Sequence, residues 1–346
     1  MARNPDIAHG PADAGRRSVL LSAAALALTV SGCSGTATRT TADGTRGPQL
    51  SAPTAPASAP GGATPSAAAL PHPTPWRPNA ADVDPQVKLR AVQLIEALGT
   101  WRPGGGGAAK ARARVTALGL PGALADQAGP LLSGADEAAL QVIDAQYGGI
   151  LTDSASVLVV CRQWTRSGGG PVTAGGTTVD VRLSRAQPRW SVTALHPATP
   201  GPASSALSDT ARKVLADHRI SLPPASAADI RSGAVHSTAL AALLRLAGGY
   251  RIDVSVVRSG HPLDVFGTHR PSDHPLGRAF DVWRINGRPV VAASTPRSLI
   301  ESFMRAAAAA GSYNVGGPVQ LGGGATSNQF FSDATHHDHV HVGFNS

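Results

Sequence analysis

Residues 272–281 limit what this chain can fold into more than any other stretch. They read Ser-Asp-His-Pro-Leu-Gly-Arg-Ala-Phe-Asp and place His274 seven positions before Asp281. On one continuous strand, that odd separation would put the two side chains on opposite faces. They can meet only if His274 lies in a loop and Asp281 lies on the strand that follows. Pro275 and Gly277 favour such a loop, because proline cannot donate a ladder hydrogen bond and glycine tolerates the positive φ of a turn.

The chain closes on a second histidine-rich stretch, Thr-His-His-Asp-His-Val-His-Val-Gly-Phe, over residues 335–344. His339 and His341 are two positions apart, so a strand would place both on one face and the intervening valines on the core-facing side. Both imidazoles could bind a metal, or one could bind it while the other handles protons. Asp338 lies at the start of this strand and is a second candidate base.

A nitrogen ligand from His274, a carboxylate from Asp281 and a second imidazole from the closing stretch make a three-ligand metal site. Three protein ligands and one open position are typical of catalytic zinc, whereas structural zinc usually takes four. The sequence therefore predicts a Zn2+ site in the C-terminal domain. The other histidines of this region are interpreted as loop or surface residues: His261, His269, His336 and His337.

These motifs resemble those of the lysostaphin, D-alanyl-D-alanine peptidase and hedgehog-type zinc metallopeptidases, which share His, six residues, Asp and a distant His-x-His. The resemblance covers residues 205–346. It implies an α+β domain with a central antiparallel sheet and a D-Ala-D-Ala carboxypeptidase or endopeptidase that cleaves peptidoglycan stem peptides. It also implies that His274, Asp281 and His341 are the metal ligands, and that His339 is the non-ligating histidine of the closing pair.

The same resemblance implies the remaining catalytic roles. Asp338 stands where some members carry an acidic general base, and His336 where others carry an extra histidine. In Val-Val-Arg-Ser-Gly-His, Arg258 is the nearest match to an arginine that stabilises the transition state. Zinc would lower the pKa of a bound water toward ~7, Asp338 or His339 would take its proton, and Arg258 would face the developing oxyanion. The alternative is a noncatalytic envelope module that keeps the metal and binds wall peptides or a protein partner.

Residues 1–33 are typical of an export signal. Arg16 and Arg17 precede an apolar run over residues 19–30, which is too short to span a bilayer as a mature helix. The run ends in Val-Ser-Gly-Cys, which resembles a bacterial lipobox. It predicts a lipid anchor at Cys33 on the extracytoplasmic face of the membrane; the alternative is an ordinary secretory signal with an incidental cysteine. The arginine pair leaves the export route open between Sec and twin-arginine.

Residues 34–80 are rich in Thr, Ala, Pro and Ser and contain almost no large apolar residue. Such a stretch cannot bury enough apolar surface to offset the entropy lost on ordering. We therefore predict a disordered tether that reaches from the membrane into the cell wall.

Residues 81–200 are predicted to form an α+β accessory domain, with helices first and an antiparallel meander after them. Helical patterns begin at Pro85 and recur over residues 135–145, and three strands are expected over residues 155–164, 177–183 and 189–195. This order is vaguely similar to the nuclear-transport-factor-like cone folds of actinobacterial lipoproteins. The domain carries no catalytic constellation and is interpreted as a spacer or binding module. A linker over residues 201–206 joins it to the zinc peptidase-like domain, residues 207–346.

Composition restricts the partners and the crosslinks. The formal net charge of +8 comes from scattered arginines rather than from a basic block. It suits an anionic envelope surface or wall polymer, and without a nucleic-acid motif we expect no nucleic-acid partner. With Cys33 lipidated, Cys161 is the only remaining thiol, so no intramolecular disulfide can form. Its apolar surroundings in the sequence predict a buried, inert thiol.

Overall fold

The computed structural model describes residues 69–346, and these residues belong to one compact unit. The predicted export signal, the lipidation site Cys33 and the tether up to position 68 lie outside the described residues. Among the described residues, no helix combines the length and the apolar composition needed to cross a bilayer. The fold is α+β, as the sequence predicts: helices and a four-stranded antiparallel meander come first, and a mixed seven-stranded sheet with helices follows.

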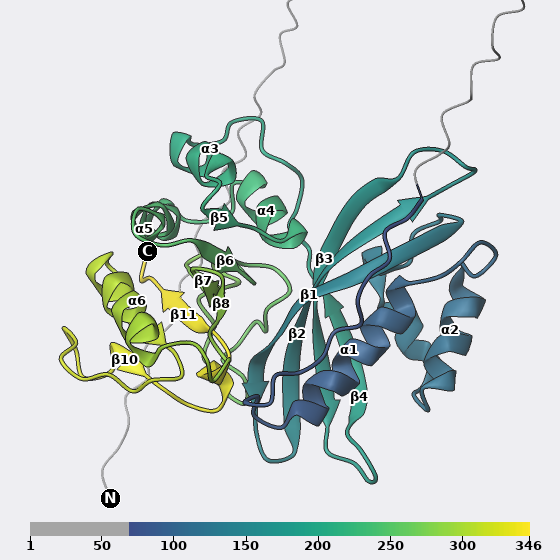
Figure 1. Cartoon of the computed structure of the whole chain (residues 1–346), viewed down its shortest axis with the longest axis horizontal. Coiled ribbons are helices and arrows are strands. Elements are labelled where there is room, and N and C mark those ends of the chain that lie inside the picture. The colour runs from purple at the N-terminus through teal and green to yellow at the C-terminus, as the bar shows by residue number, and fades with distance from the viewer. Residues whose placement is uncertain (1–68) are drawn as a thin grey trace, which may run out of the picture. The chain divides into compact units, whose positions relative to one another are not determined.

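The first half of the unit, residues 69–200, is a meander whose strands pair in the order β1-β2-β3-β4 (Figure 1). Helix α1 lies across this sheet and contacts all four strands. Its elements are α1 (Pro85–Gly99), α2 (Ala108–Ala117), the 3-10 helices η1 (Gly122–Gln127) and η2 (Gly129–Leu131), β1 (Glu137–Ile150), β2 (Ser154–Arg166), β3 (Thr173–Ser184) and β4 (Ser191–Pro197).

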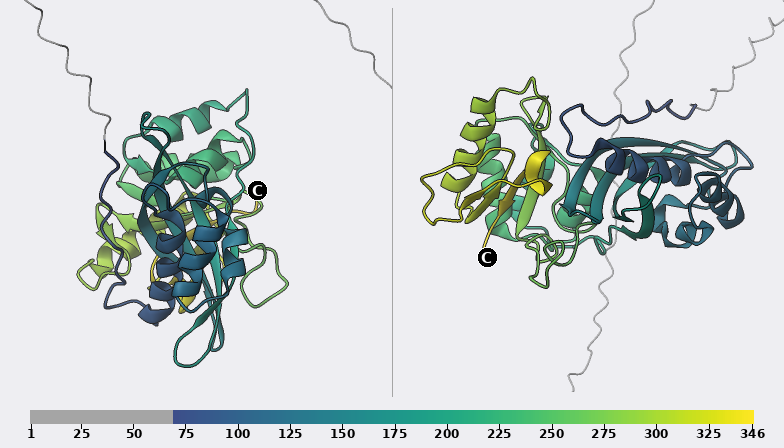
Figure 2. Two further views of the ribbon diagram at one scale, coloured as in Figure 1. Left: turned by 90° about the vertical axis from the view of Figure 1, so that its right-hand side faces the viewer. Right: turned by 90° about the horizontal axis from the view of Figure 1, so that it is seen from below.

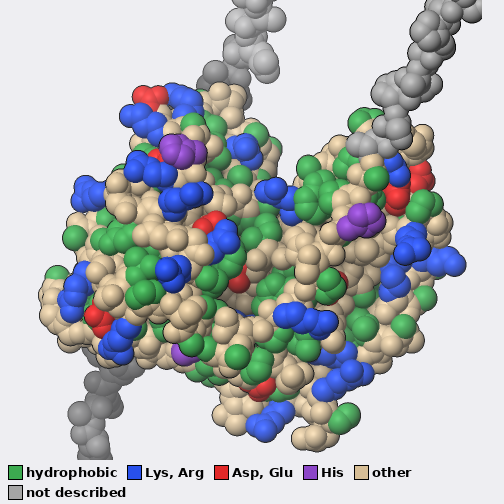
Figure 3. Space-filling view, in the orientation of Figure 1, with side chains coloured by type: hydrophobic (Ala, Val, Ile, Leu, Met, Phe, Trp, Pro, Cys, Tyr) green, Lys and Arg blue, Asp and Glu red, His purple; other side chains and the backbone are tan. Residues whose placement is uncertain are grey.

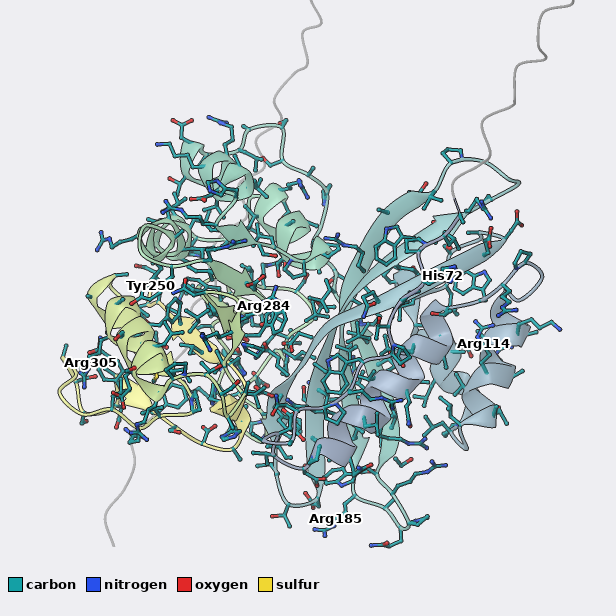
Figure 4. All side chains as sticks on the ribbon, viewed as in Figure 1. His72, Arg114, Arg185, Tyr250, Arg284 and Arg305 are labelled. Carbon is teal, nitrogen blue, oxygen red and sulfur yellow. The ribbon has the colours of Figure 1, made fainter. Side chains whose placement is uncertain are left out.

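Helix α1 begins where the sequence predicts it. Pro85 supplies a φ already suited to the first turn. The side chains of Val87, Ala91, Leu94 and Leu98 recur at helical spacing and are fully buried in the core of the first half. Arg114, labelled in Figure 4, extends from α2 and donates to the carbonyl of Ala97 at 2.6 Å, which satisfies an otherwise unpaired group of the last turn of α1.

The prediction of a helix over residues 135–145 is wrong, because Glu137–Ile150 form strand β1. Its residues include good helix formers, but pairing with β2 runs the whole length of the strand and overrides that local preference. The register shifts between Val142 and Asp144 and again between Tyr147 and Gly149. Such bulges redirect side chains, and the second one lies in the part of β1 that reaches the candidate site.

The second half of the unit carries a sheet in the order β10-β9-β11-β7-β6-β5, with β8 paired to β7. Its four central strands pair antiparallel, as predicted, whereas β10 and β5 pair in parallel at the two edges. Helices α5 and α6 contact each other, and both bury apolar side chains in the core of this half. Figure 2 shows the ribbon in two further views. Its elements are α3 (Asp209–Ala216), β5 (Ile220–Ser221), α4 (Pro224–Arg231), α5 (Ser237–Ala247), β6 (Ile252–Val254), β7 (Ala279–Ile285), β8 (Arg288–Pro289), α6 (Arg297–Ala309), β9 (Asn314–Gly316), β10 (Phe330–Phe331), η3 (Thr335–His337) and β11 (Val340–Gly343).

Each half has its own apolar core, and a small third cluster of Leu158, Val160 and Val256 joins residues of both. Basic side chains are scattered over the face drawn in Figure 3 and do not gather in one patch. The segment just before α1 lies against the first half: Trp76 packs on its core, and the backbone N–H of Trp76 donates to Glu96 Oε1 at 3.0 Å.

Candidate metal centre

Strands β7 and β11 bring the two predicted metal-binding stretches together. They are antiparallel neighbours, and His341 pairs directly with Asp281. The flanking residues Phe280 and Val342 point into the core and are buried. The bend before β7 requires a glycine: Gly277 has a φ of 71°, and a Cβ there would lie 2.1 Å from the carbonyl oxygen of Ala234.

The three predicted ligands converge on one point. Nε2 of His274 lies 3.1 Å from Oδ1 of Asp281 and 3.1 Å from Nδ1 of His341, and Nδ1 of His341 lies 3.0 Å from the same carboxylate oxygen. Zinc bonds of about 2.0–2.1 Å in a tetrahedron separate their ligand atoms by about 3.4 Å. Two imidazole nitrogens and one carboxylate oxygen in this arrangement therefore fit a metal ion with small adjustments.

His261 lies beside this cluster, although no sequence pattern distinguishes it from His269. Its ring stacks on that of His274, with centroids 4.1 Å apart and planes 18° apart. His261, His274 and Asp281 form a buried group that could hold a metal ion, with ligand atoms all within 4.8 Å of one another. His341 is not part of that group, but its Nδ1 lies 3.1 Å from His274 and 3.0 Å from Asp281, so His261 and His341 are both candidates for the third ligand.

The protonation states of these groups suit a cation. Burial opposes ionisation of Asp281, but the imidazoles of His274, His339 and His341 outweigh it and hold the pKa of the carboxyl well below its usual range. Burial lowers the pKa of His341 to about 4, and burial with the neighbouring His274 lowers the pKa of His261 well below its usual value. At neutral pH the carboxylate is anionic and these two rings are neutral, as metal binding requires.

Hydrogen bonds to the atoms that face away from the cluster orient His274 and Asp281. Nδ1 of His274 lies 2.9 Å from the carbonyl oxygen of Val257, so an N–H there leaves the Nε2 lone pair directed at the cluster. The second oxygen of Asp281, Oδ2, accepts a hydrogen bond of 2.7 Å from Nε2 of Gln146, a residue of β1. The first half of the unit therefore contacts a ligand of the metal centre.

Asp338, one of the two predicted bases, is enclosed by partners. Oδ1 lies 2.6 Å from Nδ1 of His339, and Oδ2 lies 2.6 Å from Nζ of Lys88 and accepts the N–H of Tyr147 at 3.0 Å. Burial raises the pKa of Asp338, but Lys88 and His339 outweigh it and bring the value to about 2. The carboxylate is thus a permanent anion that orients His339.

His339, the other predicted base, points at the cluster. Its Nε2 lies 3.8 Å from Oδ1 of Asp281, while its Nδ1 is held by Asp338. Burial opposes protonation of His339, but Asp281 and Asp338 outweigh it and raise the pKa of the ring. Nε2 of His339 therefore lies next to the candidate ligands without being one of the closest nitrogens.

Arg258 does not reach the cluster. It lines a neighbouring cavity of about 650 Å³ together with Arg182, and its Nη1 lies 3.6 Å from the buried carboxylate of Asp229. The metal cluster opens instead into a smaller cleft of about 550 Å³, and the arginine that lines this cleft is Arg270. The two cavities share a wall that includes His261 and Phe266.

Polar and apolar side chains both line the cleft. His274, His339 and His341 lie in its lining, and Ile150 and Leu151 at the end of β1 contribute apolar surface. Further lining residues with apolar or aromatic side chains come from both halves of the unit: Tyr147, Val265, Phe266 and Phe331.

Sequence reasoning missed the residues that the first half contributes. Lys88 and Gln146 sit in α1 and β1, far from any histidine motif, and only the tertiary contacts reveal them. One available signal was a lysine within the apolar pattern of α1, where Lys88 follows the buried Val87 and is itself only 1% exposed. A lysine that is buried in this way needs a carboxylate partner.

Comparisons of this chain with protein-family models, with curated proteins and with solved structures find no match.

Proposed function

We propose that this protein is an envelope-anchored, zinc-dependent peptidase that hydrolyses peptidoglycan stem peptides of the cell wall. The observation that carries the proposal is the convergence of His274, Asp281 and His341 at 3.0–3.1 Å, with Nε2 of His339 beside them. Two imidazoles and a carboxylate are a ligand set typical of catalytic zinc. The wall substrate and the lipid anchor at Cys33 are proposed from the motifs in the sequence.

The side chains around the cluster divide the proton chemistry between them. Zinc bound there would polarise a peptide carbonyl and acidify a water molecule. His339 accepts the proton at Nε2 and returns it to the leaving amine, because Asp338 holds its Nδ1 side and its Nε2 lies beside the candidate ligand Asp281. Asp338 holds the Nδ1–H of that ring, and with a pKa of about 2 it is itself a weak base.

Arg270 is the residue of the cleft that we propose for substrate recognition. It lies in the lining of the cleft, is exposed, and shows no side-chain hydrogen bond or ion pair within the described residues 69–346. A guanidinium forms strong paired hydrogen bonds with carboxylates. Stem peptides carry carboxylates, so Arg270 replaces Arg258 as the proposed anion-binding arginine of the site.

A digest of purified stem peptides tests the proposal. We expect products that appear with zinc, disappear with a chelator, and are lost in His339→Ala. His269→Ala is the matched control, because His269 is an exposed histidine of the same half and lies outside the cleft lining. If no stem peptide yields a chelator-sensitive product, the peptidase proposal is wrong.

The second candidate is the noncatalytic envelope module, and His261 is the observation that favours it. His261 forms a possible metal-binding group with His274 and Asp281, and together with the nearby His341 it makes four candidate ligands, the number typical of structural zinc. X-ray absorption of the zinc-loaded protein separates the two functions. Three nitrogen ligands from the protein support the module, whereas two nitrogens with a solvent oxygen support the enzyme.

A further inference from the structure

The two carboxylate oxygens of Asp281 contact different halves of the unit. Its Oδ1 faces His274 and His341, whereas its Oδ2 accepts the hydrogen bond from Gln146 Nε2 at 2.7 Å. The other end of the Gln146 amide is fixed too, because the hydroxyl of Ser255 donates to its Oε1. Asp281 and Gln146 are 0% and 1% exposed, so water does not compete for these contacts.

The pair of Asp338 and His339 is held from the same side. Lys88 of α1 lies 2.6 Å from Asp338 Oδ2 and also pairs with Asp82, which precedes α1. All four side chains are buried. One lysine therefore pairs with two carboxylates, and one of these carboxylates also contacts Nδ1 of the His339 ring.

We propose that Gln146 and Lys88 are positioning residues of the metal centre, so that the first half of the unit completes the site rather than serving as a spacer. Gln146 restricts Asp281 to binding through Oδ1. Lys88 keeps Asp338 in the position that holds Nδ1–H of His339 and leaves its Nε2 directed at the cluster. This inference rests on the proposed metal site.

The atoms that Gln146 and Lys88 contact indicate that these residues orient the site and do not merely stabilise the contact between the halves. Both residues contact oxygens that face away from the metal position, on side chains whose other oxygen faces toward it or toward His339. Outer partners of this kind hold a ligand in one orientation, and their loss typically weakens metal binding or activity by about 10–100-fold. If these residues only stabilised the contact between the halves, their loss would lower the free energy of unfolding and leave the metal affinity unchanged.

Metal affinity tests the role of Gln146. We expect Gln146→Leu to weaken binding of zinc and of cobalt about 10–100-fold and to change the visible absorption spectrum of the cobalt-loaded protein. Gln163→Leu is the matched control, because Gln163 is also a buried glutamine of the first half but donates to the carbonyls of Gly99 and Leu131, away from the site. We expect it to lower the unfolding temperature and leave the metal affinity unchanged.

A folded Gln146→Leu protein with wild-type affinity and spectrum would overturn the role of Gln146. If that variant does not fold, Ser255→Ala decides the question, because it removes the hydroxyl that holds Gln146 Oε1 and keeps the Gln146 amide. The hydroxyl also donates to the Asp281 carbonyl at 3.3 Å, but the backbone N–H of Ser255 still donates to that carbonyl in the variant. We expect a weaker affinity in the same direction, and an unchanged affinity in Ser255→Ala overturns the proposal.

Nuclear magnetic resonance tests the role of Lys88. The Nδ1–H of His339 should give a downfield imidazole resonance, identified by its absence in His339→Gln. We expect Lys88→Met to shift or broaden this resonance and Lys88→Arg to restore it. Arg90→Met is the control: Arg90 is a buried cation of the same helix that donates to the carbonyls of Trp190 and Leu118. An unchanged resonance in Lys88→Met, or in Lys88→Gln if the first variant does not fold, refutes the role of Lys88.

These readouts do not depend on hydrolysis. If the protein cleaves no stem peptide but Gln146→Leu still weakens metal binding, the peptidase proposal fails and the positioning proposal stands. If the peptidase activity is found and neither variant alters affinity, spectrum or resonance, only the positioning proposal fails.

Discussion

The two halves of the described unit contribute to the metal centre in different ways. The second half supplies His274, Asp281 and His341, from a loop and from short strands such as Val340–Gly343. The first half supplies none of these ligands, but its 14-residue strand β1 carries Gln146 to the back of Asp281. In the proposed site, the ligands come from the second half of the unit and the residues that orient them come from the first half.

The contact between the halves is mainly polar near the site. Lys88, Gln146 and Tyr147 each make a hydrogen bond or an ion pair with a residue of the second half, whereas the apolar cluster shared by the halves is small. Buried polar contacts add little net stability but cost much when one partner is removed. Substitutions on the two sides of this contact should therefore separate loss of metal from loss of stability.

The largest expected effect is the loss of metal in His274→Ala. His274 contacts both other ligands at 3.1 Å, so its removal leaves two ligands and an open site. We expect binding to weaken by more than the hundredfold typical of outer partners, measured by competition with a chromophoric chelator. His218→Ala, at an exposed histidine of the same half, should keep the metal. Full zinc content in His274→Ala would contradict the ligand assignment.

The next largest expected effect is a loss of folding stability when Lys88 of the first half is replaced. Lys88→Met leaves the buried carboxylates of Asp82 and Asp338 without their cation. We expect a loss of about 3–5 kcal/mol in the free energy of unfolding, measured by urea denaturation of the metal-free protein. A loss no larger than that of an exposed substitution such as Lys110→Met would mean that the network does not depend on Lys88.

The pH dependence of the same protein sharpens this test. The pKa of Asp338 in the folded state is about 2, below its usual value. Its stabilising contribution is therefore complete above about pH 4 and is lost as the pH falls toward 2. We expect the free energy of unfolding of the metal-free wild type to drop in this window, and the drop to be smaller in Lys88→Met because the ion pair is already absent. Equal slopes in both proteins would count against the pair.

A smaller effect is expected from Gly343→Ala at the end of β11. A Cβ there would lie 2.9 Å from Asp273 Oδ2 and 3.0 Å from His341 Nε2, so the ligand ring must move. We expect metal affinity to fall by about tenfold, at the low end of the range for residues that orient ligands. Gly322→Ala is the control, because no atom lies within 4 Å of its added Cβ. Equal affinities in the two variants would show that the ring has room to adjust.

The smallest effect on the site is expected from the core of the first half. Cys161 is fully buried, and burial raises the pKa of its thiol to about 12. We expect it to react with thiol reagents only on unfolding, and Cys161→Ala to cost about 1 kcal/mol with no change in metal affinity. A weaker affinity in this variant would show that the core of the first half, and not only the residues on its polar side, controls the site.

Local patterns were enough to predict several elements of the fold. The apolar spacing after Pro85 predicted α1, and the alternation around Asp281 and His341 predicted two strands with their histidine and aspartate side chains on one side. These predictions succeed because burial of one face imposes its period on the residues themselves. The alternation brings His341 to 3.0 Å from Asp281, and the predicted loop before β7 brings His274 to 3.1 Å from both.

Tertiary structure alone decided the rest. Residues 135–145 contain good helix formers, yet pairing with β2 makes them part of a strand, and no local signal reports a partner that lies beyond a turn. The positions of His261, Arg258 and Lys88 depend on how the loops and the two halves of the unit pack against one another. The identity of a residue does not reveal whether its side chain faces water or a buried carboxylate. The sequence by itself determined which side chains can bind a metal. The packing of α1 and β1 against the second half determined how these side chains are held.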